Sequence, residues 1–156
     1  MNCAPGHDSI DMKKTEHILL AKDNEDYALL FRRALKAASI DACLDVVHDG
    51  QEAVDYLAGA EPYADRIKHP FPKLLLLDLK MPRMDGFEVL SAVRQRLGFT
   101  RLPVIVLTHS DNPADVRRAY ELGATSFFRK PDSLEGLDEM IHVLHAYWLK
   151  FNHFPE

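Results

Sequence analysis

Short apolar runs alternate with amphipathic segments along almost the whole chain. Five of the runs have the length and the content of leucine and β-branched residues that predict strands. They are His17–Ala21, Ala42–Val47, Lys73–Asp78, Pro103–Thr108 and Ser126–Arg129. Several are apolar at consecutive rather than alternate positions, which is typical of a parallel sheet that helices cover on both faces.

The segments between these runs carry apolar residues at intervals of three and four, which predicts helices. The positions are Tyr27, Leu30, Phe31, Ala34 and Ala38; Val54 and Leu57 within Gln51–Ala58; Phe87, Leu90, Val93 and Leu97; Val116, Ala119 and Tyr120; and Leu137, Ile141, Leu144, Trp148 and Phe151. Strands that alternate with helices predict a doubly wound α/β fold. The connection Gly59–Pro72 contains three prolines and is predicted to be a surface loop, with a partner contact as the alternative.

Composition and charge fit a single globular domain. The chain has 156 residues, of which 47% are hydrophobic, enough for a sizeable core. Its net charge of −5 argues against a protein that binds nucleic acid by neutralising phosphates. No apolar run approaches the ~20 residues of a membrane span, and residues 1–16 lack the apolar stretch of a signal peptide, so we expect a cytoplasmic protein. In that compartment Cys3 and Cys43 are expected to be free thiols.

Polar side chains stand where four of the apolar runs end. Lys22 and Asp23 follow the first run, Asp78 ends the third, Thr108 ends the fourth and Lys130 follows the last. The carboxyl ends of parallel strands meet at one edge of a sheet, so these side chains are expected to lie together. Each has an ordinary explanation on its own, such as an aspartate that caps a helix. Together they favour a functional site.

Four motifs at these strand ends resemble the receiver domain of two-component response regulators. They are DNE at Asp23–Glu25, LLLLDLKMPRMDG at Leu74–Gly86, VIVLTHS at Val104–Ser110 and FFRKP at Phe127–Pro131. The resemblance implies a flavodoxin-like (βα)5 fold with strand order 2-1-3-4-5. The long loop before Phe71, the VHDGQEAVDYL segment and the AYWLKF tail further resemble the single-domain regulators that partner phytochrome-type histidine kinases.

The resemblance implies a phosphorylation switch rather than an enzyme with turnover. Asp78 would accept a phosphoryl group from a sensor histidine kinase, and Lys130 and Thr108 would contact its oxygens. Mg²⁺ would be held by Asp23, Asp78 and the backbone carbonyl of Lys80. Thr108 and Phe127 would move together as the switch. Lys80 and Ser110 stand at positions that tune hydrolysis in the family, and neither is an acid or an amide, so slow self-dephosphorylation is expected.

Lys22 departs from the family pattern, which has an acidic residue directly before Asp23. Its ammonium either turns outward and leaves a weaker metal site, or fills part of the metal's volume, and Glu25 is a candidate replacement ligand. The alternative function is therefore a degenerate, receiver-like binding module that works without phosphorylation. A flavin protein or an aspartate-dependent phosphatase of the same fold is the enzyme alternative, and the lack of a separate general acid beside Asp78 disfavours the phosphatase.

The receiver domain is expected over residues 17–151, between a flexible tail at 1–16 and a short tail at 152–156. The residues after it are too few for a DNA-binding domain, so output through protein–protein contacts is expected. Tyr147 and Phe154 lie outside the core-facing stripe of the last helix, which predicts a homodimer built partly on that helix. The alternative is that the tail folds back over the domain's own core.

Overall fold

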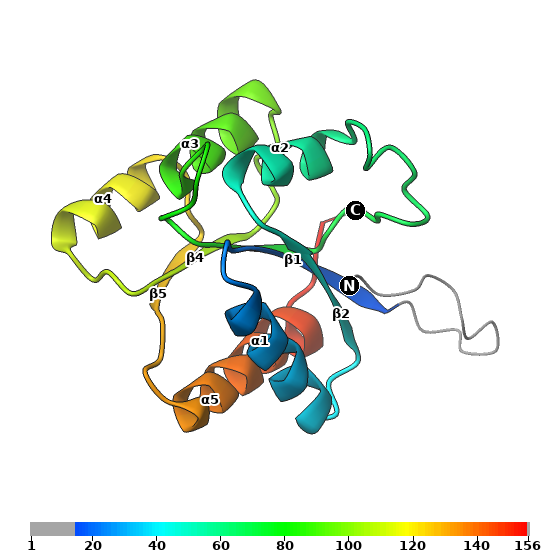
Figure 1. Ribbon diagram of the computed structural model, residues 1–156, viewed down its shortest axis with the longest axis vertical. Coiled ribbons are helices and arrows are strands. Elements are labelled where there is room, and N and C mark those ends of the chain that lie inside the picture. Colours follow the sequence, from blue (N-terminus) through cyan, green and yellow to red (C-terminus); the bar gives the residue numbers. More distant parts are fainter. Residues whose placement is uncertain (1–14, 156) are drawn as a thin grey trace.

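The computed structural model describes residues 15–155, and its centre is a single parallel sheet of five strands (Figure 1). The strands are β1 (Glu16–Ala21), β2 (Ala42–Val47), β3 (Leu74–Leu77), β4 (Val104–Thr108) and β5 (Ser126–Arg129). Their order is β2-β1-β3-β4-β5, and each neighbouring pair is parallel. The predicted flavodoxin-like fold and strand order are confirmed, which places the topological switch point between β1 and β3.

Helices cover both faces of this sheet (Figure 1). One face carries α1 (Glu25–Ala37) and α5 (Leu134–Leu144), and the other carries α2 (Gly50–Ala58), α3 (Gly86–Ser91) and α4 (Pro113–Glu121). The π-helical turn η1 (Ala92–Arg96) continues α3, and the π-helical segment η2 (His145–Phe151) continues α5. Among the described residues, no helix is long and apolar enough to cross a membrane.

The strands are apolar at consecutive positions because they contribute to a core layer on each face. In β3, Leu75 and Leu77 pack in the layer under α2 and α3, whereas Leu74 and Leu76 pack in the layer under α1 and α5. All four side chains have 0% exposure. Such a strand has no place for a polar side chain until it ends.

The register of the strands brings their carboxyl ends to one edge. Leu77 of β3 pairs with Ala21 of β1, and the amide of Asp78 donates to the carbonyl of Ala21 at 3.1 Å. At the other side of the sheet, the amide of Lys130 donates to the carbonyl of Thr108 at 2.7 Å. The polar residues that follow the strands therefore share this edge, as predicted.

The end of the chain departs from the predicted helical stripe. The stripe is buried as far as Leu144, but Phe151 is 69% exposed. The wider π-helical turns of η2 rotate the following residues away from a period of 3.6, so the prediction that Phe151 faces the core is wrong. Phe154 instead returns to stack on Trp148, with 6.5 Å between ring centroids, and its ring lies 5.3 Å from the ammonium of Lys73.

The expectation of a free thiol at Cys43 is also wrong, because this residue of β2 is disulfide-bonded in the structure. Cys3 and all but the last two residues of the tail predicted at 1–16 lie outside the described residues. β1 begins at Glu16, one residue before the predicted start of the strand.

Candidate functional site

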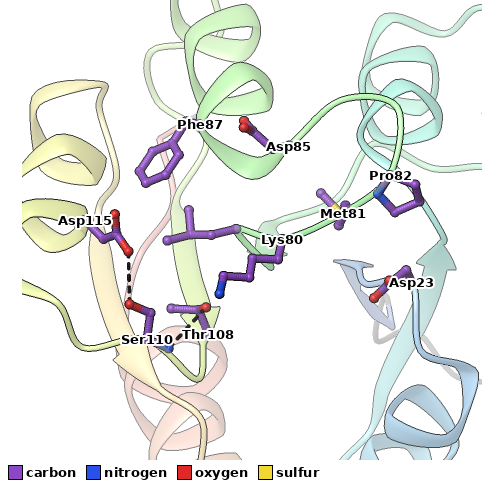
Figure 2. A pocket seen from close by; sticks show the side chains of 10 residues that line it. Asp23, Lys80, Met81, Pro82, Asp85, Phe87, Thr108, Ser110 and Asp115 are labelled. Atoms are coloured by element: carbon purple, nitrogen blue, oxygen red, sulfur yellow. Dashed lines mark hydrogen bonds between the residues drawn. The ribbon is translucent and has the colours of Figure 1, made fainter.

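An open cleft of about 550 Å³ lies at the carboxyl edge of the sheet (Figure 2). Asp23 lines it from the loop after β1, Lys80 and Asp85 from the loop after β3, and Thr108 and Ser110 from the end of β4. Of the strand-end residues singled out in the sequence, Asp23 and Thr108 therefore line this cleft, whereas Lys22, Asp78 and Lys130 do not.

Asp78 precedes the cleft-lining loop and is only 4% exposed. The amide of Lys80 donates a long hydrogen bond, 3.4 Å, to its Oδ1. The loop turns back closely upon this position: the amide of Gly86 donates to the carbonyl of Leu79 at 2.9 Å. A Cβ at Gly86 would clash with the carbonyl oxygen of Asp78, so only glycine fits here without a shift. Asp85 closes the loop by forming a capping box at the start of α3.

The side chain of Lys22 points into the site. Its Nζ lies 2.8 Å from Oδ2 of Asp78 and 3.5 Å from Oδ1 of Asp23, and the side chain is 12% exposed. Of the two alternatives for this lysine, the structure shows the one in which the ammonium enters the site, and not the outward-turned one. Burial lowers the pKa of Lys22, but the hydrogen bond to Asp78 and the nearby carboxylates outweigh burial and raise it overall. The ammonium is therefore held in its charged form.

Lys130 approaches the same carboxylate oxygen from the end of β5. Its Nζ lies 3.5 Å from Oδ2 of Asp78, and its side chain is 1% exposed. Burial, and then the neighbouring ammonium of Lys22, lower the pKa of Lys130 to about 8. The ring of Tyr27 in α1 lies 4.9 Å from the ammonium of Lys130 and 5.9 Å from that of Lys22. Sequence reasoning took Tyr27 only as part of a helical stripe and missed this second role.

Thr108 is buried at the end of β4, where the amide of Ser110 approaches its hydroxyl at 3.5 Å. The hydroxyl of Ser110 donates to Oδ2 of Asp115 at 3.0 Å, and all three side chains line the cleft (Figure 2). Asp115, in the first turn of α4, was not predicted as part of the site. The sequence indicates it only by its place, as an acidic residue shortly after a strand-end motif. Phe127 is half-buried in β5 and packs on the core under α2 and α3.

Asp23 is not a helix cap, because Asn24 caps α1 through hydrogen bonds to its side chain. The side chain of Asp23 is 46% exposed and faces the cleft. Glu25 is 83% exposed and lies 3.4 Å from the ring of His48, so it is not placed as a replacement ligand. The loop after β1 thus offers the site one carboxylate and one ammonium.

A divalent cation does not fit the site as its side chains lie. Asp23, Asp78 and the carbonyl of Lys80 have the oxygen chemistry that Mg²⁺ prefers. However, the ammonium of Lys22 contacts both carboxylates and stands between them. Within residues 15–155, no three acidic, histidine or cysteine side chains are grouped so as to hold a metal ion.

Comparison with known proteins decides the family. Residues 18–142 match the family described as the response regulator receiver domain. The chain belongs to this family. The predicted resemblance is thereby confirmed, and the buried Asp78 stands in its LLLLDLKMPRMDG motif.

Two regulators are among the proteins to which the chain is similar. The chain is 36% identical over 153 residues to the probable methanogenesis regulatory protein FilR2 of Methanothrix harundinacea, with 96% of each chain covered. It is 36% identical over 133 residues to the response regulator Rcp1 of a Synechocystis strain, covering 85% of this chain and 88% of Rcp1.

Two solved structures support the finer resemblance to phytochrome-associated regulators. The phosphorylated cyanobacterial phytochrome response regulator RcpA superposes with a TM-score of 0.83 at 31% identity, covering 92% of this chain and 100% of RcpA. The Mn²⁺-bound form of Rcp1 has a TM-score of 0.80 at 35% identity, covering 90% and 99% of the two chains. Relatives of this receiver thus include both a phosphorylated and a metal-bound form.

Proposed function

We propose that this chain is a response regulator that accepts a phosphoryl group on Asp78 from a sensor histidine kinase. One observation carries the proposal: the carboxylate of Asp78 is buried at the carboxyl edge of the sheet, beside two ammonium groups and next to a cleft that contains Thr108. The relationship to Rcp1 and RcpA favours a kinase of the phytochrome type.

The two oxygens of Asp78 have different surroundings, which favours Oδ1 as the nucleophile. Oδ2 faces the ammonium groups of Lys22 and Lys130, whereas Oδ1 accepts a long hydrogen bond from the amide of Lys80. In the proposed reaction, Oδ1 forms a bond to phosphorus while the phosphorus–nitrogen bond of the kinase phosphohistidine breaks. The electron pair of that bond leaves with the histidine nitrogen. Lys130 and the hydroxyl of Thr108 stabilise the charge on the phosphoryl oxygens.

Phosphorylation would act on the rest of the domain through Thr108 and Phe127. Thr108 moves toward the phosphoryl group, and the ring of Phe127 moves into the space that it leaves. Val106, two residues before Thr108 in β4, pairs with Phe127 in β5, so the two residues belong to adjoining strands. Return to the resting state is proposed to be slow, because the side chains of Lys80 and Ser110 are not suited to orient a water molecule for hydrolysis of the phosphoryl group.

We propose that Mg²⁺ binding is weaker here than in receivers with an acidic residue at position 22. Asp23, Asp78 and the backbone carbonyl of Lys80 would hold the ion, whose chemistry is to neutralise phosphoryl oxygens. Lys22 has to leave the two carboxylates first, and its hydrogen bond to Asp78 opposes this.

The output is proposed to be a contact with another protein, in the cytoplasm, without direct binding to DNA or to a membrane. Residues 17–151 form the proposed receiver domain. A homodimer through the last helix is also proposed: Val143, Tyr147 and Phe151 recur at intervals of four and are 52%, 59% and 69% exposed. The stacking of Phe154 on Trp148 supports a tail that also covers the domain's own core.

A second function is favoured by the position of Lys22. Its ammonium satisfies the carboxylates of Asp23 and Asp78 without any ligand. A receiver whose site is held in this way could act as a binding module that works without phosphorylation.

The two functions are separated by incubating the protein with acetyl phosphate and Mg²⁺ and measuring its intact mass. The phosphorylation proposal predicts the addition of one phosphoryl group and no addition to Asp78→Asn. Labelling that persists in Asp78→Asn would refute the assignment of the acceptor. A chain that stays unlabelled, while its circular dichroism shows it to be folded, would favour the binding module.

A further inference from the structure

The positive charge between Asp23 and Asp78 comes from the protein itself, from the ammonium group of Lys22. Lys22 Nζ contacts Oδ2 of Asp78 at 2.8 Å and Oδ1 of Asp23 at 3.5 Å. Lys130 Nζ lies 3.5 Å from the same Oδ2. Two carboxylates and two ammonium groups therefore balance one another without a bound ion.

We propose that the Lys22 ammonium replaces the divalent metal in phosphoryl acceptance by Asp78, so that the reaction proceeds without added metal. The inference rests on the proposed function, since it concerns the same acceptor. It assigns to Lys22 the task of holding one oxygen of Asp78 and of offering a positive charge to the incoming phosphoryl group.

The position of the ammonium is built into the fold rather than left to a mobile side chain. Lys22 follows β1 directly, and its amide donates to the carbonyl of Val47 at 3.0 Å, which fixes the start of its side chain. Its side chain is 12% exposed, far less than that of a solvated lysine. The ring of Tyr27 lies beside both ammonium groups, and such a ring face attracts cations.

The same arrangement places both ammonium groups on one of the two oxygens of Asp78. Both ammonium groups face Oδ2 of Asp78, and a charge-assisted hydrogen bond of 2.8 Å is a strong restraint on that oxygen. The proposal assigns the attack to Oδ1, which accepts only a long hydrogen bond from the amide of Lys80. With acetyl phosphate as donor, Oδ1 forms a bond to phosphorus, the bond from phosphorus to the acetyl oxygen breaks, and the electron pair leaves on acetate. No oxidant or co-reactant is needed.

The test compares phosphorylation by acetyl phosphate in excess EDTA and in Mg²⁺, followed by intact mass over time. The proteins are the wild type, Lys22→Met, which removes the charge at similar length, and Lys22→Glu, which restores an acidic residue. Lys36→Met is the matched control, because Lys36 is an exposed lysine of α1 away from the cleft.

The wild type and Lys36→Met are expected to react at similar rates with and without Mg²⁺. In EDTA, Lys22→Met is expected to be slower by about 100-fold, the scale for removing one pre-positioned group that stabilises developing charge. Lys22→Glu is expected to require Mg²⁺. A second readout is the electron paramagnetic resonance signal of free Mn²⁺, which Lys22→Glu should diminish at lower protein concentration than the wild type does.

Labelling of the wild type only when Mg²⁺ is present would overturn the inference and leave the proposed function intact. The inference is likewise overturned if the wild type stays unlabelled while Lys22→Glu is labelled with Mg²⁺, since Lys22 would then block the site. Absence of label on every variant under both conditions, with all of them folded by circular dichroism, would instead contradict the proposed function itself.

Discussion

Lys22 and Asp78 are 56 residues apart in the sequence, and the side-chain nitrogen of one lies 2.8 Å from Oδ2 of the other. This contact joins the loop after β1 to the end of β3, across the topological switch point of the sheet. It places the ammonium group of Lys22 where receivers of this family have an acidic side chain, directly before the aspartate that corresponds to Asp23. The charges of the carboxylates at this site are therefore balanced by an ammonium group of the protein.

The first prediction concerns metal affinity. Replacing Lys22 by glutamate removes a positive charge from between two carboxylates and adds a negative one. Unit charges about 4 Å apart interact with about 4 kcal/mol at an effective dielectric constant of 20. About a third of this, about 1.4 kcal/mol, tightens Mg²⁺ binding about tenfold. Isothermal titration calorimetry of Mg²⁺ measures the change, and Lys36→Glu controls for net charge. Equal dissociation constants for the wild type and Lys22→Glu would show that the ammonium does not compete with the metal.

The second prediction concerns the backbone of the acceptor. In Gly86→Ala, the new Cβ meets the carbonyl oxygen of Asp78 and lies 2.7 Å from Cα of Leu79. Overpacking of this kind lowers the free energy of unfolding by about 1–3 kcal/mol, and the shift of Asp78 should slow its phosphorylation. Urea unfolding and the acetyl phosphate assay measure the two effects.

Gly98→Ala is the matched control for that experiment. Gly98 has a φ of +70°, and no atom lies within 4 Å of the place that a Cβ would take, so alanine there is strained but touches nothing. It should lose about 1–2 kcal/mol of stability and keep its rate of phosphorylation. Similar rates for Gly86→Ala and Gly98→Ala would contradict the assigned role of Gly86.

Most of the fold was predictable from the sequence because the strands are buried on both faces of the sheet, and such strands have to be apolar at nearly every position. The leucines of β3 have to be apolar at every position, and the first polar residue after them, Asp78, marks the end of the strand. The same reasoning located Thr108 and Lys130, because each follows or ends a run that the sheet buries. Shared register then brings these residues together without any knowledge of their side-chain conformations.

The parts that could not be predicted depend on side-chain direction and on contacts between distant helices. Lys22 has a long, flexible side chain, and the sequence does not show whether it points to water or to Asp78. Tyr27 and Asp115 reach the site from α1 and α4, whose rotation about their axes depends on packing. Phe151 was misplaced because η2 is a π-helical segment, and a pattern with a period of 3.6 does not reveal that change.

The third prediction concerns stability away from the cleft. The hydroxyl of Tyr56 lies 3.3 Å from Oδ2 of Asp45 and donates to the carbonyl of Pro70 at 2.9 Å. Asp45 is 1% exposed and its Oδ1 has no hydrogen-bond partner, so Tyr56→Phe leaves a buried carboxylate with still fewer contacts. The free energy of unfolding at neutral pH should fall by about 1–2 kcal/mol. Tyr120→Phe, at a half-exposed position of α4, should change it little.

The loss of stability caused by Tyr56→Phe should become smaller at alkaline pH. Burial, and then the charge of Asp45, raise the pKa of Tyr56 above its ordinary value of 10.0. Above the ordinary pKa of 10.0, the hydroxyl of Tyr56 releases its proton in the unfolded chain but keeps it in the native state. Rising pH therefore lowers the free energy of unfolding of the wild type. The phenylalanine variant lacks this group, and the two unfolding curves should therefore approach one another toward about pH 11. A constant difference from neutral to alkaline pH would contradict the burial of this hydroxyl.

The fourth prediction is that the exposed stripe of Val143, Tyr147 and Phe151 forms the homodimer contact. Tyr147→Ala should shift the dimer to a monomer in size-exclusion chromatography with light scattering at micromolar concentrations, since large aromatic side chains dominate such interfaces. Tyr120→Ala is the matched control. Phe154→Ala should lower stability instead, because Phe154 covers Trp148 within the domain. A monomer mass for the wild type at all concentrations would rule out the dimer.

Locating the modified residue shows whether Asp78 accepts the phosphoryl group. Sodium borohydride reduces an aspartyl phosphate to homoserine, so the protein is phosphorylated with acetyl phosphate, reduced, digested and sequenced by tandem mass spectrometry. We expect homoserine at position 78 and at no other aspartate, with none formed in protein that was not exposed to the donor. Homoserine at Asp23 or another position, with Asp78 unchanged, would contradict this expectation.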